Sequence, residues 1–306
     1  MNSSGKKTGT ESTMIISSPE CNTWFAVFLI ESVAVVAVNL LSIILFMKNR
    51  NLRTRAMFLV INLTIADMLV GGFSSIPLFK LLGLGCDIVN ISLTKKGYNI
   101  TFYFFYWFVL SSLTSIAAIS LDRLHATFRP LRHRVIKEWV YGVTIAGVWV
   151  LTAIISTAIR IVGLLGEEGS HSFYLWQSYN CLCLFFICVS YASIVVKCLY
   201  GTHPQHHGAA SRQRKLTVTL FIMTIVSLLM WLPYVVATFV YYKTTRMESY
   251  QTKLRVQYSL LVFLHINSLA NPIVYTVRIP RFRKALLTLF NCRQKQNVAI
   301  IPLRAR

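Results

Sequence analysis

Long apolar runs are the feature that most constrains this chain. A helix needs about 20 apolar residues to cross a bilayer, and runs of this length recur between short polar stretches. A bilayer offers no water to backbone groups, so such runs cross it as helices. Only 13% of the side chains are charged, whereas soluble domains carry about a quarter. We predict an all-α membrane protein, a seven-transmembrane helix bundle. The predicted helices are 24–48, 54–82, 98–125, 137–163, 175–200, 213–242 and 254–277.

Two shorter segments flank the predicted membrane domain, which spans residues 24–277. Residues 1–23 are polar and rich in Ser and Thr, and we expect an extracellular tail without a cleaved signal peptide. Residues 278–306 form a predicted cytoplasmic segment. It begins with a short amphipathic eighth helix at 278–290.

Basic residues set the predicted orientation. Twenty-one Lys and Arg residues fall on the side of the membrane that holds the C-terminus, and ten fall on the other side. The positive-inside rule therefore makes the C-terminal side cytoplasmic. The sequons at Asn2, Asn90 and Asn99 lie on the opposite side, where glycosylation takes place. The net charge of +21 is concentrated at the ends of apolar runs, which indicates contact with a lipid bilayer and not with nucleic acid.

Polar side chains occur at bilayer depth, where a charged residue costs at least about 2.5–3.5 kcal/mol. Asp67 lies in the second predicted helix. Amide and hydroxyl side chains lie at mid-membrane positions in other predicted helices: Asn39, Ser112, Asn267, Ser268 and Asn271. A carboxylate surrounded by such oxygens is a site for a hard cation. Hydrogen bonds that hold helices together are the other interpretation, and the residues alone leave both open.

Two further features lie in the third, sixth and seventh runs. Arg123 follows Asp122 at the end of the third predicted helix, about 39 Å from its start at 1.5 Å per residue, and so reaches the cytoplasmic interface. A snorkelling anchor is the common alternative for such an arginine. Pro233 and Pro272 interrupt the sixth and seventh helices. Each removes a backbone hydrogen bond, which makes each a candidate hinge, although a static kink is at least as common.

These residues occur in an order that resembles the rhodopsin-like G-protein-coupled receptors. Asp67 ends the sequence LTIAD, which resembles the LxxAD motif of helix two, and Asp122 begins a DRL sequence similar to the DRY motif. The WLP sequence that ends at Pro233 resembles CWLP, and residues 271–275 form an intact NPxxY motif. Asn39, Trp149 and Tyr191 match typical single positions in helices one, four and five. The resemblance covers residues 24–291.

The resemblance implies a function. A receptor of this family binds an extracellular ligand, activates a heterotrimeric G protein at the plasma membrane, and is not an enzyme. The residues expected to carry coupling and activation are Asp122, Arg123, Tyr191, Pro233, Asn271, Pro272 and Tyr275. The family's sodium pocket is matched by Asp67, Ser112, Asn267, Ser268 and Asn271. An allosteric sodium ion is therefore expected, and no other cofactor.

Some positions depart from the family pattern. The usual disulfide from the top of helix three is expected to be absent, because Tyr98 stands at that position and residues 164–180 contain no Cys. Cys21 and Cys86 form a predicted pair across the outer ends of the first two helices. The helix-five proline is missing as well, and this combination resembles the branch that holds melanocortin, cannabinoid and sphingolipid receptors. No acidic residue precedes Lys215 to lock the inactive state, so we expect some basal signalling.

The ligand is not assigned by these residues. Phe105 replaces the aspartate of amine receptors, and His265 stands where opsins carry the retinal lysine, so neither an amine nor retinal is expected. Aromatic walls with a few polar groups are typical of small-ligand pockets, although helix packing explains any single aromatic residue equally well. The predicted outer pocket contains Phe102, Phe105, Tyr106, Trp231, Tyr234, Thr238 and His265, with Glu31 orienting His265.

Two other classes of protein fit the sequence less well. A transporter or channel carries inverted repeats or paired broken helices, and the chain shows no internal repeat. An intramembrane enzyme needs His or acidic clusters on facing helices, and no HExxH-type spacing occurs. His203, His206 and His207 fall in a short inner loop, where a solvated basic turn is the simpler interpretation.

Overall fold

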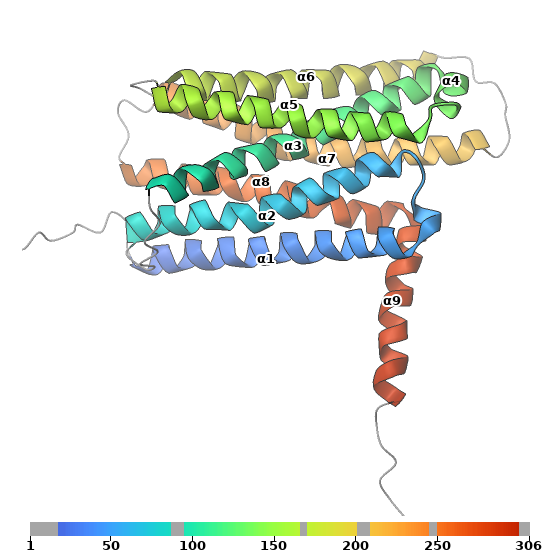
Figure 1. Ribbon diagram of the computed structural model, residues 1–306, viewed down its shortest axis with the longest axis horizontal. Coiled ribbons are helices and arrows are strands. Elements are labelled where there is room, and N and C mark those ends of the chain that lie inside the picture. Colours follow the sequence, from blue (N-terminus) through green and yellow to red (C-terminus); the bar gives the residue numbers. More distant parts are fainter. Residues whose placement is uncertain (1–17, 87–94, 166–169, 201–208, 245–249, 300–306) are drawn as a thin grey trace, which may run out of the picture.

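Seven long helices lie side by side in the structure, a computed structural model that describes the backbone of residues 18–86, 95–165, 170–200, 209–244 and 250–299 (Figure 1). The long helices are α1 (Ser18–Lys48), α2 (Met57–Cys86), α3 (Lys95–Phe128), α5 (Glu138–Leu165), α6 (Ser170–Tyr200), α7 (Ala209–Thr244) and α8 (Tyr250–Arg278). Three further helices are η1 (Arg50–Leu52), α4 (Pro130–Arg134) and α9 (Pro280–Ala299). The predicted all-α, seven-helix architecture with a C-terminal eighth helix is confirmed.

The observed helices extend past most of the predicted bounds. Hydropathy marks only the apolar part of a helix, whereas polar residues at both ends continue the same backbone hydrogen bonds. The last helix, α9, runs to Ala299 and not to residue 290, since residues 281–299 contain neither Gly nor Pro. The inner loop contains α4, which was not predicted. Pro130 begins α4, and proline is favoured at the first position of a helix.

Six helical stretches within the described part of the chain are long and apolar enough to cross a membrane. They are Pro19–Lys48, Ile100–Phe128, Glu138–Leu165, His171–Tyr200, Thr217–Val240 and Arg255–Arg278. In α2 the described apolar stretch is shorter, Met57–Phe73, because the side chains beyond it are outside the described residues. The helix itself has 30 residues, which is about 45 Å at 1.5 Å per residue and sufficient to cross a bilayer.

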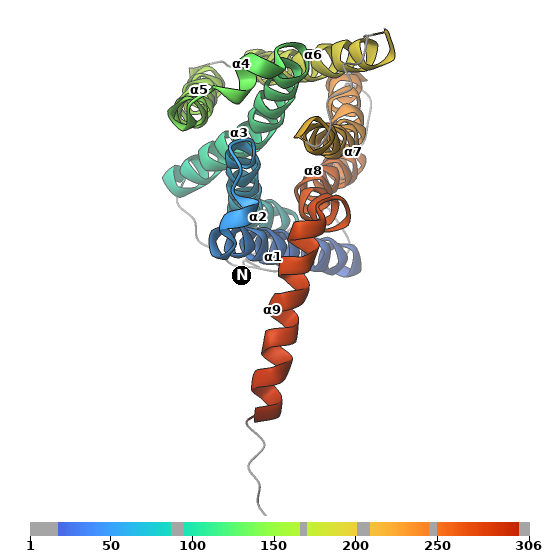
Figure 2. The same ribbon diagram turned by 90° about the vertical axis from the view of Figure 1, so that its right-hand side faces the viewer.

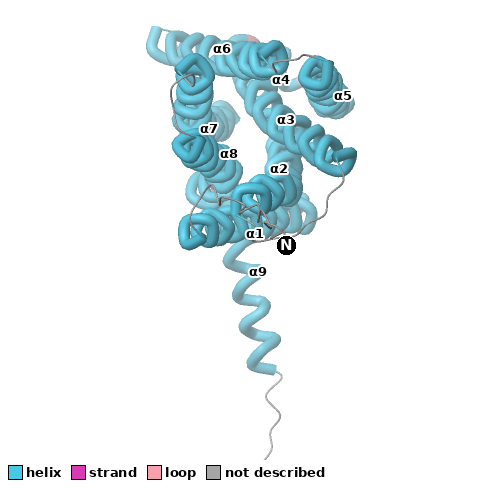
Figure 3. The backbone as a smooth tube through the Cα atoms, turned by 90° about the vertical axis from the view of Figure 1, so that its left-hand side faces the viewer, coloured by secondary structure: helices cyan, strands magenta, loops and turns pink. Residues whose placement is uncertain are grey.

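The long helices form a ring in which α3 crosses the interior. Seen from either end, α1, α2, α3, α5, α6, α7 and α8 follow one another around the bundle (Figures 2 and 3). Helix α3 also packs against α6 and α7. Of its membrane-spanning stretch 67% is buried, against 22% for α5, which makes α3 the central helix. Helix α9 begins directly after the C-terminal end of α8 and points away from the bundle, crosswise to the long helices (Figure 1).

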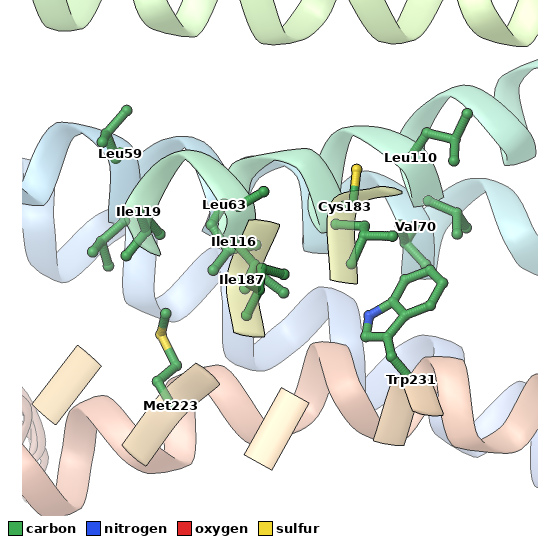
Figure 4. Packing of buried hydrophobic residues seen from close by; sticks show 14 of the residues in the cluster. Leu59, Leu63, Val70, Leu110, Ile116, Ile119, Cys183, Ile187, Met223 and Trp231 are labelled. Carbon is green, nitrogen blue, oxygen red and sulfur yellow. The ribbon is translucent and has the colours of Figure 1, made fainter. Parts of the chain in front are cut away.

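A single large core fills the bundle. Figure 4 shows Met223 and Trp231 of α7 pointing inward toward side chains of α2, α3 and α6. On the outside, α5 exposes a stripe of large apolar side chains, including Trp139, Val150 and Ile154. Such a stripe is stable in lipid, and Trp is favoured at the boundary between lipid and water.

A polar chain ties α2, α3 and α5 together inside the core. The Trp149 indole donates to Asn62 Oδ1 over 2.8 Å, and Asn62 Nδ2 donates to Ser115 Oγ over 2.9 Å. Lipid tails provide little hydrophobic drive for one helix to bind another, so interhelical hydrogen bonds contribute to packing. Trp149 therefore acts as a contact between helices.

Helices α1 and α8 are joined near their N-terminal ends. Arg255 donates two hydrogen bonds to the Glu20 carboxylate, Nε to Oε1 over 2.7 Å and Nη2 to Oε2 over 2.8 Å. Beneath this ion pair Cys21, Phe28 and Tyr258 form a small separate cluster. Cys21 is in a disulfide. The predicted partner Cys86 is outside the residues whose side chains are described, so that pairing stays a prediction.

The close contact between α1 and α2 depends on Gly71. A Cβ atom at Gly71 would lie 2.6 Å from Val35 Cγ1 and 2.8 Å from Val35 Cβ. Gly71→Ala is therefore expected to destabilise the bundle by about 1–3 kcal/mol through overpacking, seen as a lower Tm of the purified protein in detergent. Gly147→Ala is the control, because nothing lies within 4 Å of a Cβ there. Equal Tm values for the two variants would contradict this packing.

Candidate functional site

Three groups of polar or aromatic side chains lie inside the bundle. We call them the central group around Asp67, the inner group around Arg123, and the outer group around Trp231 and His265. All four named side chains are at most 2% exposed. Buried polar atoms require partners, so the three groups are described by their hydrogen bonds and ring contacts.

The central group is built on the Asp67 carboxylate. Ser112 Oγ of α3 and Ser268 Oγ of α8 donate to Asp67 Oδ1, over 2.6 Å and 3.0 Å. Asn271 Nδ2 of α8 donates to Asp67 Oδ2 over 2.7 Å. The structure therefore brings four of the five predicted residues of this cluster into direct contact.

The fifth predicted residue, Asn267, lies beside the cluster without a hydrogen bond to Asp67. Its Oδ1 atom is buried and has no partner among the described residues, and the same is true of Asn39 Oδ1. Both atoms are acceptors only. The central group thus combines a carboxylate with unpartnered amide oxygens, and no described Lys, Arg or His is in contact with it.

Asn39 replaces a hydrogen bond that Pro272 removes. Proline has no N–H, so the carbonyl oxygen four residues earlier, on Ser268, loses its helical partner. Asn39 Nδ2 donates to that oxygen over 3.1 Å, and also to Val35 O in its own helix over 2.9 Å. Helix α8 continues through Pro272. The asparagine therefore joins α1 to the interrupted turn of α8, next to the central group.

The inner group is centred on the neighbouring residues Asp122 and Arg123. Arg123 is 0% exposed and its Nη2 atom contacts Asp122 Oδ2. The other carboxylate oxygen is close to two side chains, His133 Nε2 at 3.0 Å and Tyr141 OH at 3.2 Å. Arg123 is not a snorkelling anchor, because a snorkelling side chain keeps its charged end in water.

The remaining guanidinium atoms of Arg123, Nε and Nη1, are buried without a hydrogen bond in the described part of the chain. Tyr191 accepts a hydrogen bond from Thr224 over 3.1 Å, which joins α6 to α7. Tyr275 is 0% exposed, and its hydroxyl has no partner in the same part of the chain. Neither tyrosine is hydrogen-bonded to Arg123 in the described part of the chain.

Aromatic side chains from three helices form the main part of the outer group. Tyr106 of α3 packs against Trp176 of α6 with ring centroids 4.8 Å apart. Trp231 and Tyr234 of α7 meet edge to face at 5.9 Å. Thr238 donates to the Tyr234 carbonyl, so its hydroxyl is engaged within α7. Phe102 and Phe105 each contact Tyr106.

His265 and Glu31 are in contact, as the sequence suggested. His265 Nδ1 lies 3.2 Å from Glu31 Oε2, and the edge of the Phe28 ring packs on the imidazole. The other ring nitrogen, Nε2, is buried without a partner among the side chains that the structure describes. A hydrogen bond to a carboxylate fixes the orientation of an imidazole, so Nε2 is held in place with free hydrogen-bonding capacity.

Asn180 and Gln177 were not predicted as site residues. Gln177 Nε2 donates to Val235 O over 2.6 Å. Since α6 and α7 are antiparallel, Asn180, one turn further along α6, lies at the level of Trp231. Asn180 is 0% exposed, and neither of its amide atoms has a partner among the described residues. The signal that could have identified both residues in the sequence is their polar side chains within an apolar run.

Several predicted positions cannot be located. Asn2 and Asn90 are outside the described residues. Asn99 lies in the first turns of α3, but its side chain, like those of Tyr98 and Lys215, is not described. Within the described residues no group of three or more His, Cys, Asp or Glu side chains is placed to hold a metal ion. His203, His206 and His207 are outside the described residues.

Known proteins are similar to this chain in sequence and in fold. Human melanocortin receptor 5 is 26% identical over 290 residues, which cover 91% of this chain and 87% of that receptor. Rhodopsin from Myripristis violacea is 24% identical over 285 residues, covering 83% and 77%. The crystal structure of squid rhodopsin superposes with a TM-score of 0.71 at 17% identity, covering 90% of this chain and 87% of that one, and so supports the fold.

A ring of seven apolar helices around a buried carboxylate, with a buried arginine at its inner end, defines a multi-pass membrane protein of the receptor class. Residues 38–275 match the family described as 7 transmembrane receptor (rhodopsin family). The chain belongs to this family and is a G-protein-coupled receptor. The family is one of receptors and not of enzymes.

Proposed function

We propose that this receptor lies in the plasma membrane with its N-terminus outside, binds a small extracellular ligand in the outer group, and couples to a heterotrimeric G protein through the inner group. The distribution of Lys and Arg supports this orientation, because twenty-one of them lie on the C-terminal side. The observation that carries the coupling proposal is the fully buried Arg123 held by Asp122.

The inner group supplies a two-state element. Arg123 is held on one carboxylate oxygen, while its Nε and Nη1 atoms have no partner among the described residues. An outward movement of the inner half of α7 about Pro233 would open a groove for a helix of the partner. Arg123 would then exchange Asp122 for the partner, and Tyr191 and Tyr275 would turn toward it. Residues 129–137 form the neighbouring basic contact surface.

The outer group supports a ligand with an apolar body and a few hydrogen-bonding groups. Its walls are aromatic, and polar atoms without a described partner are found on two sides: His265 Nε2 on α8, and the Asn180 amide with the Trp231 indole N–H between α6 and α7. Small-molecule pockets combine such walls with a small number of placed polar groups. Melanocortin receptor 5 is similar in sequence, but the acidic cluster of melanocortin receptors is replaced here by Pro77, Tyr98 and Phe102.

Alanine substitutions test the outer pocket. With an agonist found by screening small molecules for nucleotide exchange, Tyr106→Ala, Tyr234→Ala and His265→Ala are each expected to weaken its affinity at least about tenfold, since each removes a buried contact. Surface expression is expected to stay normal. Leu182→Ala, on the exposed side of α6, is the control. If expression falls while affinity is retained, these residues are packing residues and the pocket is wrongly placed.

The central group is proposed as an allosteric sodium site. A hard monovalent cation prefers oxygen ligands, and this group offers the Asp67 carboxylate, the hydroxyls of Ser112 and Ser268, and the amide oxygen of Asn267. The residues present therefore fit the ion. Bound sodium would supply the counter-charge that an ionised, fully buried carboxylate otherwise lacks.

A further inference from the structure

His133 occupies a position that the proposed coupling does not by itself explain. It lies on α4, the short helix of the inner loop, and its Nε2 atom is 3.0 Å from Asp122 Oδ1. Tyr141 of α5 is 3.2 Å from the same oxygen and 3.3 Å from the same nitrogen. The His133 side chain is 11% exposed and that of Asp122 is 12% exposed. The contact is therefore largely shielded, with an edge open to water.

The chemistry of the two side chains determines which atom donates the hydrogen bond in this contact. A carboxylate only accepts, so His133 Nε2 must carry a proton to bond with Asp122 Oδ1. Arg123 uses the other oxygen, Oδ2. One negative charge is thus shared by a permanent cation, Arg123, and by His133, which becomes a second cation when both of its ring nitrogens carry a proton.

The other charged or titratable groups around His133 come from every adjacent element. On α3 the His125 ring lies 5.7 Å from the His133 ring. Arg55, just before α2, donates to the carbonyls of Arg134 and Ile136 over 3.0 Å and 2.9 Å, and so fixes the end of the inner loop. Helix α4 adds the exposed Arg132 and Arg134, and α5 adds the exposed Glu138. Among the described residues here, Asp122 is the buried carboxylate.

We propose that His133 is a positioning residue for Asp122 and makes the Asp122–Arg123 pairing depend on cytoplasmic pH. Protonation of His133 places a second cation on the carboxylate that holds Arg123. The two cations repel each other at a separation shorter than the Debye length of about 8 Å, while Asp122 keeps a charged partner in His133. Arg123 is released more easily, so acidification of the cytoplasmic side raises basal coupling. This inference rests on the proposed coupling through Arg123.

Basal nucleotide exchange at two pH values tests the proposal. In open membrane sheets with added G protein, exchange per receptor is expected to rise about threefold from about pH 7.5 to about pH 6, the scale of a partly screened ion-pair interaction. Receptor-free membranes correct for the G protein's own pH response. His133→Gln keeps an N–H donor but does not titrate, so its ratio of exchange at the two pH values is expected to be close to one.

Two controls separate His133 from the other histidines. His125→Gln, which removes the neighbouring ring, and a variant with His203, His206 and His207 all replaced by Gln are expected to keep the threefold ratio. A ratio that persists in His133→Gln overturns the proposal, and so does a wild-type receptor whose exchange stays constant or falls on acidification.

A second measurement does not depend on coupling. In ¹⁵N-histidine-labelled receptor, the His133 ring nitrogens are assigned by their loss in His133→Gln. They are expected to show a protonated Nε2 and to change in Asp122→Asn, because the acceptor changes. No change in Asp122→Asn overturns the inference even if coupling through Arg123 holds. If the His133 nitrogen signals do change in Asp122→Asn but the receptor gives no nucleotide exchange at either pH, the proposed coupling is contradicted instead.

Discussion

Arg123→Ala is expected to reduce nucleotide exchange on a G protein by at least about tenfold, since removing one buried charged contact at an interface typically costs enough free energy for that change. The substitution removes the guanidinium but leaves Asp122 with two other partners, His133 and Tyr141. The inner end is therefore expected to keep its fold. Exchange is measured in membranes, per receptor, with each major type of G protein in turn.

The matched control for this prediction is Arg50→Ala. Arg50 also lies at the inner end of the bundle, in η1, and is exposed, so the control removes one positive charge without touching the buried pair. Exchange is expected to remain close to that of the unmodified receptor. If Arg123→Ala couples as well as the unmodified receptor across all G-protein types, the inner group is not the coupling site.

Sodium is expected to stabilise the receptor and lower its basal exchange, whereas a large organic cation at the same ionic strength has neither effect. A ligand that binds one state stabilises that state by about 1.4 kcal/mol when its concentration is about tenfold above Kd. We expect the inactive state to keep room for the ion around Asp67 and activation to remove that room. Only this difference in affinity between the two states allows sodium to shift their balance. The measurements are the Tm of purified receptor and basal exchange in membranes.

Asp67→Asn is expected to abolish the difference between sodium and the organic cation, because it removes the charge that binds the ion. Ser112→Ala, which removes a hydroxyl at 2.6 Å from the carboxylate, is expected to weaken the sodium effect. Ser120→Ala is the control, since Ser120 is equally buried in α3 but donates to the Ala117 carbonyl. If the two cations act alike on the unmodified receptor, the central group only holds helices together.

The long helices and much of the central group could be predicted from the sequence because both depend on local patterns. An apolar run long enough to cross a bilayer becomes a helix wherever it occurs in the chain. A charged residue in such a run almost always faces the interior, which places Asp67 inside the bundle before any contact is known, and the resemblance to the family's sodium pocket adds Ser112 and Ser268. The family motifs added the expected role of Arg123.

The contacts around those residues could not be predicted in the same way. His133 and Tyr141 reach Asp122 because the chain turns at α4 and α5 then packs back along α3, and the sequence predicted no helix at α4. Glu20 and Arg255 are 235 residues apart in the chain, and Asn180 carries no local sign that its amide is left unpaired at the level of Trp231. Such pairings depend on the rotation and depth of each helix.

The sequence by itself determined that this chain crosses a membrane as seven helices, which side is basic, and which polar residues face inward. The physical reason is that the transfer of apolar side chains and backbone groups out of water acts on each segment separately. Only the tertiary structure decided that Asn39 donates to the carbonyl freed by Pro272 and that the missing side chain of Gly71 leaves room for Val35. It also decided that the Asp122 carboxylate contacts both Arg123 and His133. Those results depend on distances of a few ångströms between helices, and hydrogen bonds and packing contacts exist only at such distances.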